Sequence, residues 1–578
     1  MSIKDLLNKR IKAAMKDVGV PSKCSPSISE SIRPEFGDFQ ANGVMAAAKV
    51  MGSNPRQVAL DVIAKLDLKG IAEKIEIAGP GFINIHLSND FLTESIMKLS
   101  VDKALGIRKV QPQKIVIDYS SPNLAKEMHV GHLRSTIIGD SVARTLEFLG
   151  HNVIRQNHMG DWGTQFGMLI AELEDEQSTK EKHSLLLGDL EIFYQRSKKH
   201  FDRDINFANK ARDYVVKLQS GDEHCLGLWK NFIDISIAHI ESIYQDLNVT
   251  LKTSDIKPES SYNEDLGKIL ADLKDKNLAV EDQGAQVVFL SELSDKKGTP
   301  SAVIIEKSGG GFLYATTDLA ALRYRNDNLK PDRILYFIDA RQSLHMKQVF
   351  VLAKKAEFVD KNISLEHHAF GTMMSKDGKP FKTRTGGTIK LSELLKEATE
   401  RATALVKTKN PGLPKDEVTS IAKKLGIGAV KYADLSKTRT NDYIFNWDSM
   451  LCFEGNTAPY LQYAYTRIYS LFEKASIQPN DINRNIDICT VFERNLVLSL
   501  LHFGETLDQV AAQGYPHILC NYLYNLASSY MVFYENCPVF KENIPQETRD
   551  SRLMLSRITS QILEKGLSLL GIEVMKKM

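Results

Sequence analysis

The sequence predicts an α/β protein: a doubly wound parallel sheet with a smaller α+β unit before it and an all-helical domain after it. Apolar strand patterns that alternate with helix patterns predict the sheet, and nearly continuous helical spacing beyond residue 391 predicts the helical domain. The strand patterns lie at 115–119, 152–155 and 333–338, and the helix patterns lie at 133–149 and 343–355. In such folds, nucleotide ligands lie at the carboxyl ends of the parallel strands.

The bulk composition is that of an ordinary globular protein. The 578 residues are 43% hydrophobic and 25% charged, and the mean hydropathy is −0.24, which argues against disordered and fibrous classes. The chain is too long for one hydrophobic core, so roughly two to four domains are expected. Because the formal net charge is only +2, a polyanionic partner has to be held by local basic patches.

The N-terminal residues and the cysteines favour a cytoplasmic protein. The first residues predict an amphipathic helix rather than a signal peptide, and no apolar run approaches the ~20 residues of a membrane helix. The six cysteines are scattered and form no C-x-x-C pair. We therefore expect reduced thiols, without a disulfide framework or a zinc site, and no membrane association.

Changes in pattern divide the chain into four regions. These are an α+β unit at 1–108, the parallel-sheet domain at 109–390 with a mainly helical insertion at about 170–300, a helical connection at 391–455, and the helical domain at 456–578. In the first unit we expect helices at 4–16, 40–50 and 55–66 and strands at 75–78 and 82–87. In the last we expect helices at 460–475, 492–510, 517–534 and 551–570.

The segment 121–132 lies between the first strand and its helix, where a ligand is expected, and it ends in His129-Val130-Gly131-His132. Gly131 lets a bulky ligand approach the backbone, and the helix N-terminus favours anions. The two histidines can donate hydrogen bonds to a polyphosphate as charge moves onto it. A surface turn with incidental histidines, or half of a metal site, is the alternative; the strand before and the helix after favour the phosphate site.

These residues resemble the HIGH signature of class I aminoacyl-tRNA synthetases, and the longer string 121–140 is similar to the arginyl-tRNA synthetase family. The resemblance covers almost the whole chain, including the strings at 35–42, 159–167, 339–345, 379–384 and 453–463. It implies a class I synthetase fold with a HIGH region from Pro122 to His132, and a monomer that uses ATP and Mg²⁺ to join L-arginine to the terminal 2′-OH of tRNA(Arg). It also implies that arginine activation requires bound tRNA.

A planar guanidinium is bound best by a carboxylate that accepts two of its hydrogen bonds. Asp118 ends the first strand and resembles the family's acidic residue for this group; a carboxylate that caps the next turn is the competing interpretation. Tyr314 and Asp318 share a face if helical, and a helix N-cap is the alternative for Asp318. The arginine pocket that the resemblance implies consists of Asp118, Ser120, Asn123, His129, Tyr314, Asp318 and Gln342.

The second catalytic element departs from the class pattern, which has a Lys-Met-Ser-Lys-Ser loop. Residues 380–387 read Pro-Phe-Lys-Thr-Arg-Thr-Gly-Gly and place Thr383 in the register of the second lysine. Some arginyl enzymes share this departure and have a lysine just before the HIGH motif, at the place of Lys126. We hypothesise that Lys126 supplies the missing positive charge at the α-phosphate; an exposed lysine in a turn is the alternative. The implied ATP-binding set is Lys126, His129, Gly131, His132, Met374 and Lys382, and its catalytic members are Lys126, His129, His132 and Lys382.

Aromatic residues interleaved with arginine in the last domain suit RNA, because aromatic rings stack on splayed bases and arginine pairs with phosphate. Tyr460 and Arg467 are the candidates there, although most tyrosines of a helical bundle are core residues. The resemblance assigns this domain to the anticodon and the N-terminal unit to the outer corner of the tRNA. In that unit Asn84 is a candidate for reading a loop base, with a strand asparagine at a turn or bulge as the alternative.

Three other functions compete with this interpretation. A small-molecule nucleotidylyltransferase also uses an H-x-G-H turn, but it has no use for a long helical domain with an aromatic face. A catalytically silent tRNA-binding paralogue would be signalled by loss of His129, Gly131 or His132, and all three are present. A class I enzyme for another amino acid would not call for Asp118 and Asp318, and a cysteinyl enzyme would require zinc-binding cysteines.

Lys126→Ala is expected to slow the pyrophosphate-releasing step strongly and to leave tRNA binding nearly intact, because the substitution removes one charge at the α-phosphate. ATP–pyrophosphate exchange measures the first quantity and filter binding of tRNA the second. An unchanged kcat would contradict the hypothesis.

Overall fold

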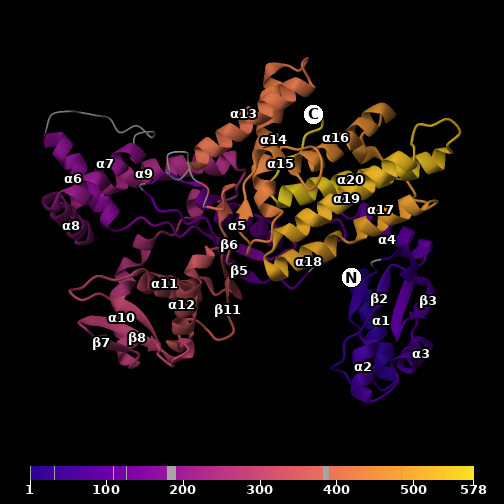
Figure 1. The fold of residues 1–578 in the computed structure, drawn as a ribbon, viewed down its shortest axis with the longest axis horizontal. Helices are drawn as coiled ribbons and strands as arrows, with labels where there is room; N and C mark the ends of the chain where they lie inside the picture. Colours follow the sequence, from indigo (N-terminus) through magenta and orange to yellow (C-terminus); the bar gives the residue numbers. More distant parts are fainter. Residues whose placement is uncertain are drawn as a thin grey trace.

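The computed structural model describes residues 2–31, 33–108, 110–124, 126–178, 190–379, 381, 389–482 and 484–578. Figure 1 shows the parallel sheet near the centre of an elongated molecule, with the insertion on one side and the C-terminal helices and the N-terminal unit on the other. Among the described helices, none combines the length and apolar composition that crossing a bilayer requires.

The N-terminal unit is a four-stranded antiparallel sheet, in the order β1-β2-β4-β3, packed with helices. Its elements are α1 (Ile3–Asp17), β1 (Ile28–Glu30), β2 (Phe39–Ala41), α2 (Val44–Met51), α3 (Pro55–Lys65), β3 (Ala72–Ala78), β4 (Phe82–Leu87) and α4 (Asn89–Val101). The helix expected at 40–50 begins later, at Val44, because Phe39 to Ala41 pair with β4. Local spacing could not reveal that partner, which lies more than 40 residues along the chain.

The central sheet is parallel throughout, in the order β11-β10-β5-β6, which confirms the doubly wound prediction. Its elements are β5 (Lys114–Asp118), α5 (Val130–Phe148), β6 (Asn152–Gln156), β10 (Arg333–Tyr336), α12 (Ser343–Lys355) and β11 (Ser364–His367). The chain runs outward from β5 to β6 and later returns to β10 on the other side of β5. By the general rule for such sheets, this reversal places the expected ligand site, the crevice, at the carboxyl ends of β5 and β10.

The insertion is helical in its first half and contains a three-stranded antiparallel sheet in its second. Its elements, with the helix that follows, are α6 (Thr164–Ser178), α7 (Leu190–Arg203), α8 (Ile205–Gln219), α9 (Glu223–Asp246), α10 (Asn263–Asp275), β7 (Ala279–Asp282), β8 (Ala285–Leu290), β9 (Ser301–Glu306) and α11 (Tyr314–Tyr324). The expected mainly helical insertion is therefore correct except for this sheet.

From residue 391 onward the chain is almost wholly helical, as predicted. Its elements, with the short strand before it, are β12 (Met373–Met374), α13 (Leu391–Lys409), α14 (Lys415–Leu435), β13 (Tyr443–Ile444), α15 (Trp447–Met450), α16 (Ala458–Ala475), α17 (Val491–Leu501), α18 (Phe503–Gln513), α19 (Pro516–Asn536) and α20 (Gln546–Leu569). The single helix expected at 492–510 is two helices. His502 ends α17 and starts α18, and a break of one residue leaves the apolar spacing almost unchanged.

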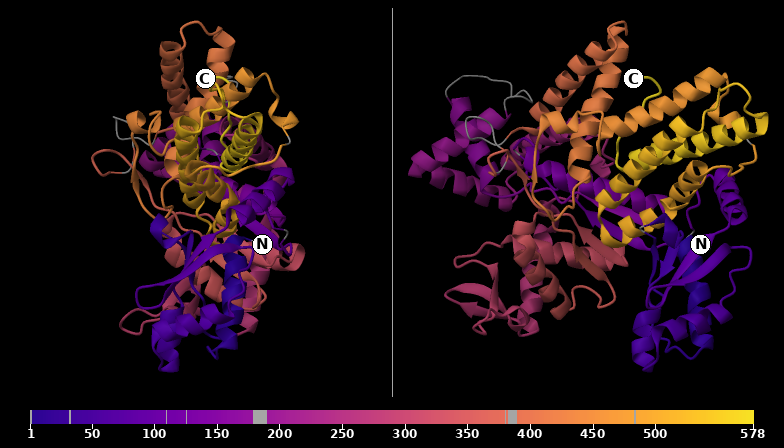
Figure 2. Two further views of the ribbon diagram at one scale, coloured as in Figure 1. Left: turned by 90° about the vertical axis from the view of Figure 1, so that its right-hand side faces the viewer. Right: turned by 45° about the vertical axis from the view of Figure 1, so that its right-hand side comes forward.

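A polar joint ties the N-terminal unit to the helical domain, which Figure 2 shows lying beside each other. Arg494 of α17 donates from both terminal nitrogens to Asp38, at 2.6 and 2.8 Å, and also donates to the Leu87 carbonyl. Asp38 accepts in addition from the Leu87 amide at 2.7 Å. A bidentate pair of this kind fixes orientation as well as distance.

Arg494→Ala is expected to weaken the docking of the N-terminal unit by roughly 2 kcal/mol, because it leaves the half-buried Asp38 carboxylate without its charged partner. Limited proteolysis should then cut the connection at residues 102–113 faster than in the parent protein. Lys98→Ala, which breaks only the exposed Glu94–Lys98 pair, is the matched control and should leave the cutting rate unchanged. Equal rates for all three proteins would contradict the role of the joint.

Candidate active site

The histidines of the HIGH turn form the start of helix α5 by capping it. His129 is the N-cap residue; its Nδ1 accepts from the Gly131 amide at 3.0 Å, and its own amide donates to Nδ1 of His132 at 3.1 Å. Since Nδ1 of each ring is an acceptor, each neutral ring carries its proton on Nε2. Burial and the neighbouring His129 lower the pKa of His132 to about 3. His132 is therefore a neutral donor at physiological pH.

Gly131 is required by this geometry rather than by its φ angle. A Cβ at this position would lie 2.7 Å from Cε1 and 2.9 Å from Nδ1 of His129, so a side chain would displace the ring. The neighbouring backbone also forms hydrogen bonds with residues 389–391. The Val130 amide donates to Ile389 O, and the Leu391 amide donates to Met128 O. The HIGH turn thus pairs with the chain that follows residues 382–388. Lys382 lies outside the described residues, and Met374, on strand β12, is bonded through its carbonyl to the Phe445 amide at 2.9 Å.

Lys126 lies where the insertion meets the HIGH turn. Its Nζ is 4.8 Å from the centroid of the Tyr194 ring on α7, and its charge contributes to the lowered pKa of His132. Its neighbour Glu127 forms an ion pair with Lys390 at 2.8 Å. The ammonium therefore lies close enough to the HIGH histidines to act electrostatically on the same ligand.

Asp118, which the sequence predicts as a carboxylate for the substrate guanidinium, already has partners within the protein. It is 3% exposed, and its Oδ2 accepts from Nη2 of Arg325 at 2.6 Å while its Oδ1 accepts from the Ser121 hydroxyl at 2.9 Å. An internal guanidinium thus occupies the position predicted for a substrate guanidinium. Arg325 lies more than 200 residues away in the sequence, so no local pattern indicated this pair.

Ser120 likewise faces inward. Its hydroxyl lies 2.7 Å from the Tyr244 hydroxyl and accepts from Thr136 at 2.9 Å, and the contact of Ser120 with arginine stays a prediction. Ser120 and Ser121 both have left-handed backbones, with φ of 71° and 43°. Two successive non-glycine residues in this region indicate a strained turn that surrounding contacts hold in place.

Asp318 is the carboxylate that the structure leaves accessible at the crevice. It lies inside α11, whose N-cap is Leu313, so the alternative of a helix cap is wrong. Its Oδ2 is 2.6 Å from Nε2 of His345, and its Oδ1 is 4.0 Å from Nε2 of His158. The hydrogen bond to Asp318 raises the pKa of His345.

Glu259 is a candidate site residue that the sequence did not indicate. Burial, together with the nearby Asp318 and Asp161 carboxylates, raises the pKa of Glu259 to about 7. A cluster of carboxylates that disfavour one another's ionisation is typical of a site that receives a cation. Glu259 lies in the polar insertion, where one more acidic residue carries no signal; only its proximity to Asp318 distinguishes it.

Three predicted pocket residues are exposed around the crevice. Tyr314 is 71% exposed in the first turn of α11, one turn before Asp318, and Gln342 precedes α12, which carries His345. Asn123 bridges to Gly160, and a Cβ at Gly160 would lie 2.1 Å from Asn123 Oδ1. The predicted set therefore divides: Asp118 and Ser120 are internal, whereas Asn123, Tyr314, Asp318 and Gln342 are accessible.

The residues predicted to contact RNA are less exposed than expected. Asn84 is 1% exposed and accepts from Gln40 Nε2 at 2.7 Å, and its contact with a loop base stays a prediction. Tyr460 packs on Tyr524 with ring centroids 5.6 Å apart, and the Arg467 guanidinium lies 4.5 Å from the centroid of the Tyr534 ring. Both residues are half-buried, and contact with RNA stays a prediction for them.

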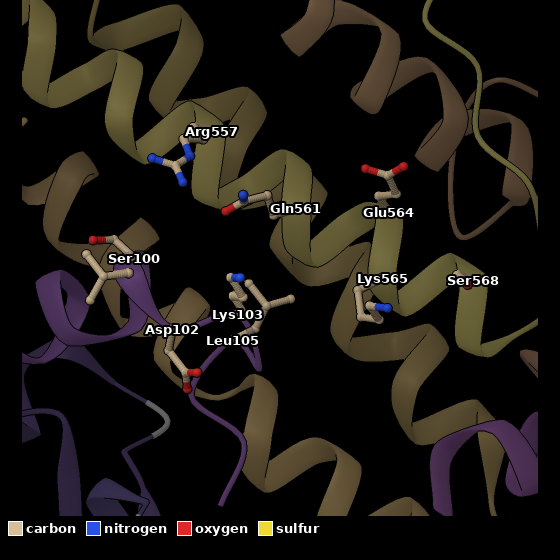
Figure 3. A pocket seen from close by; sticks show the side chains of 10 residues that line it. Ser100, Asp102, Lys103, Leu105, Arg557, Gln561, Glu564, Lys565 and Ser568 are labelled. Carbon is tan, nitrogen blue, oxygen red and sulfur yellow. The ribbon is translucent and has the colours of Figure 1, made fainter. Parts of the chain in front are cut away.

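A groove of about 680 Å³ lies away from this site, between residues 100–105 and α20. Figure 3 shows its side chains, which include the cations Lys103, Arg557 and Lys565 and the anions Asp102 and Glu564. Because these charges nearly balance, the groove favours neither an anion nor a cation. No group of metal ligands occurs among the residues that the structure describes, and all six cysteines are free thiols.

Comparison with known proteins matches family models to three parts of the chain. The model described as "Arginyl tRNA synthetase N terminal domain" matches residues 4–87. The model described as "tRNA synthetases class I (R), catalytic domain" matches residues 95–447, and the "DALR anticodon binding domain" model matches residues 461–578.

Similar proteins span the whole chain. The curated arginine–tRNA ligase of Cellvibrio japonicus is 60% identical over 579 residues and covers 100% of both chains. The crystal structure of arginyl-tRNA synthetase from Plasmodium falciparum is 30% identical, with a TM-score of 0.84, and covers 100% of this chain and 99% of that one. The Thermus thermophilus arginyl-tRNA synthetase structure has a TM-score of 0.83 over 100% of both chains; at 24% identity it supports the fold alone.

Glu259→Gln is expected to raise the melting temperature at pH 8 and to change it less at pH 5. A carboxyl whose pKa is raised by folding destabilises the folded state once it must ionise, so stability falls as pH rises from the ordinary value toward 7. Because glutamine does not ionise, the variant keeps the stability that the parent protein loses as pH rises. Glu281→Gln, at an exposed position of β7, is the control, and an equal effect of both variants at pH 8 would contradict the assignment.

Proposed function

The chain belongs to the class I arginyl-tRNA synthetase family, and we infer from this membership and from the crevice geometry how its residues join arginine to tRNA(Arg). The enzyme activates L-arginine with ATP, forming arginyl-adenylate and pyrophosphate, and then esterifies the 3′-terminal adenosine of the tRNA. The observation that carries the residue assignment is the HIGH turn, where two Nε2–H donors lie at the switch point of the parallel sheet beside an acidic pocket.

The activation step needs positioning and charge stabilisation rather than a covalent enzyme intermediate. The arginine carboxylate attacks the α-phosphate in line, and pyrophosphate leaves. His129 and His132 donate from Nε2 to the phosphates as negative charge develops, and Gly131 and the N-terminus of α5 receive the nucleotide. Mg²⁺ enters as the complex with ATP, because this cation is commonly held through substrate phosphates and few protein ligands.

Lys126 supplies a further positive charge at the α-phosphate, and Lys382 and Met374 complete the nucleotide site. The support for Lys126 is its place between α7 and the HIGH turn and its electrostatic action on His132. A lysine can serve here because a phosphate oxygen needs only a point charge, not a planar fork.

The substrate guanidinium is bound by Asp318 and Glu259. Two carboxylates lie near each other here, and one of them has its pKa raised to about 7. Such a pair is stabilised most by a permanently charged guanidinium, which donates two hydrogen bonds to a carboxylate. Tyr314 covers this pocket, and Asn123, His129 and Gln342 provide polar contacts for the rest of the amino acid. Free lysine binds weakly, because its compact ammonium lacks the planar fork of five donors that can pair with carboxylates through two hydrogen bonds at once. A site that leaves buried polar groups unpaired rejects such an analogue.

The tRNA extends from the crevice to both outer domains. The helical domain at 456–578 binds the anticodon, with Tyr460 and Arg467 on the face where α16 meets α19, and the N-terminal unit at 1–108 contacts the outer corner of the tRNA. We propose that the enzyme acts as a monomer in the cytoplasm.

ATP–pyrophosphate exchange with each amino acid, with and without total tRNA, tests this function. We expect exchange with arginine alone, and faster exchange when tRNA is present. Exchange driven by another amino acid would overturn the substrate assignment. Arginine exchange that is equally fast without tRNA would overturn the requirement for tRNA.

A further inference from the structure

Arg325 is a buried arginine directly beneath the proposed amino-acid pocket. Its side chain is 0% exposed, and its Nη2 donates a hydrogen bond to Oδ2 of Asp118 at 2.6 Å. The Tyr336 ring lies 5.0 Å from its guanidinium carbon. A charge that is fully removed from water is tolerated only with a partner of this kind, because its desolvation is very unfavourable.

The helix that carries Arg325 also carries the pocket. Asp318 and Arg325 are seven residues apart, close to two turns, so both project from one face of α11 and its extension. At Arg325 the α-helix changes to a π-helix, Arg325–Leu329. Such segments are rare and occur frequently at functional sites. One face therefore presents a carboxylate to the crevice and a guanidinium to the edge of the sheet.

Hydrogen bonds connect the Arg325–Asp118 ion pair with residues beside the proposed pocket. Asp118 accepts from the Ser121 hydroxyl at 2.9 Å, and that hydroxyl accepts from the His158 amide at 3.1 Å. Ser121 has φ of 43°, so contacts of this kind hold the turn against its backbone preference. The same turn leads to Pro122 and Asn123. The His158 side chain approaches Asp318 at 4.0 Å, so the chain of contacts begins at Arg325 and reaches both sides of the pocket.

We propose that Arg325 is a positioning residue for arginine recognition: its internal guanidinium neutralises Asp118, holds the turn at 118–121, and leaves Asp318 and Glu259 as the carboxylates for the substrate. This inference rests on the proposed function of the crevice. It accounts for the presence of a third carboxylate beside a pocket that binds one cation. Without Arg325, a guanidinium from solution has a second place to bind, at Asp118.

The Nε and Nη1 atoms of Arg325 have no hydrogen-bond partner among the described residues. The buried Tyr262 hydroxyl has no hydrogen-bond partner among them either. The cavity that remains after truncation of Arg325 is therefore lined by Asp118, the Tyr336 ring and polar atoms. Its size and charge suit a small guanidinium ion. Chemical rescue can consequently distinguish a positioning role from a purely structural one.

The test compares Arg325→Ala with the parent enzyme in ATP–pyrophosphate exchange with tRNA present. We expect the KM for arginine to rise about tenfold or more and the KM for ATP to stay within about twofold, since the HIGH turn is not altered. Methylguanidinium at millimolar concentration should restore most of the lost kcat/KM for arginine. Arg552→Ala is the matched control. It removes a buried arginine paired with Glu493 at 2.8 Å in the helical domain, and methylguanidinium should not rescue any loss it causes.

Arg325→Lys covers the case in which the alanine variant does not fold. It keeps the charge but not the fork, so we expect a folded enzyme with a raised KM for arginine that methylguanidinium does not rescue. An unchanged KM for arginine in a folded Arg325 variant, or an Arg325→Ala enzyme without rescue, would overturn the inference alone. Absence of arginine-dependent exchange in the parent enzyme would instead overturn the proposed function.

Discussion

The reciprocal capping of helix α5 by His129 and His132 is the interaction on which the catalytic centre depends. It commits one ring nitrogen of each histidine to the backbone, so the other nitrogen is a donor whose direction the helix sets. The helix is buried along most of its length. Tyr119 donates to Asp140 at 3.1 Å, and a Cβ at Gly139 would lie 2.3 Å from Tyr119 Cβ. The strand and the helix therefore approach closely, and the donors cannot shift independently of the sheet.

The acidic residues around the crevice have different roles because their surroundings differ. Asp118 has a permanent internal partner in Arg325, whereas Asp318 faces a titratable histidine and Glu259 is held partly neutral by burial and like charge. In a low-dielectric pocket, a carboxylate without a partner is unfavourable. A cationic substrate relieves this repulsion at Asp318 and Glu259 but gains nothing at Asp118. Selectivity thus depends on which carboxylates the fold has already neutralised.

The parts of the molecule that local patterns specify were predictable. The helix expected at 343–355 has those bounds in the structure, and the strand–turn–helix around the HIGH motif follows its predicted order. The errors have non-local causes. Gln40 and Ala41 belong to a strand because Asn84 and Ile83 pair with them. Asp118 has an internal partner because Arg325 reaches it from the end of α11. Glu259 could not be recognised because its significance is its distance from Asp318, which spacing along the chain does not encode.

Lys431 of α14 shows how the end of the last helix supports the centre of the fold. The lysine is buried, burial lowers its pKa to about 7, and it donates to the Leu247 carbonyl at 2.6 Å and the Gly571 carbonyl at 2.8 Å. On the same side, Arg144 of α5 donates to Asn248 O at 2.6 Å and to Ser568 O at 3.3 Å. Each of these two basic side chains thus has one acceptor near residue 247 and a second one near the end of the chain, so neither completes its hydrogen bonds until residues 568 and 571 have been synthesised. During translation, the helix that carries the HIGH turn cannot complete its packing until the ribosome has made almost the entire chain, although its own sequence emerges in the first third.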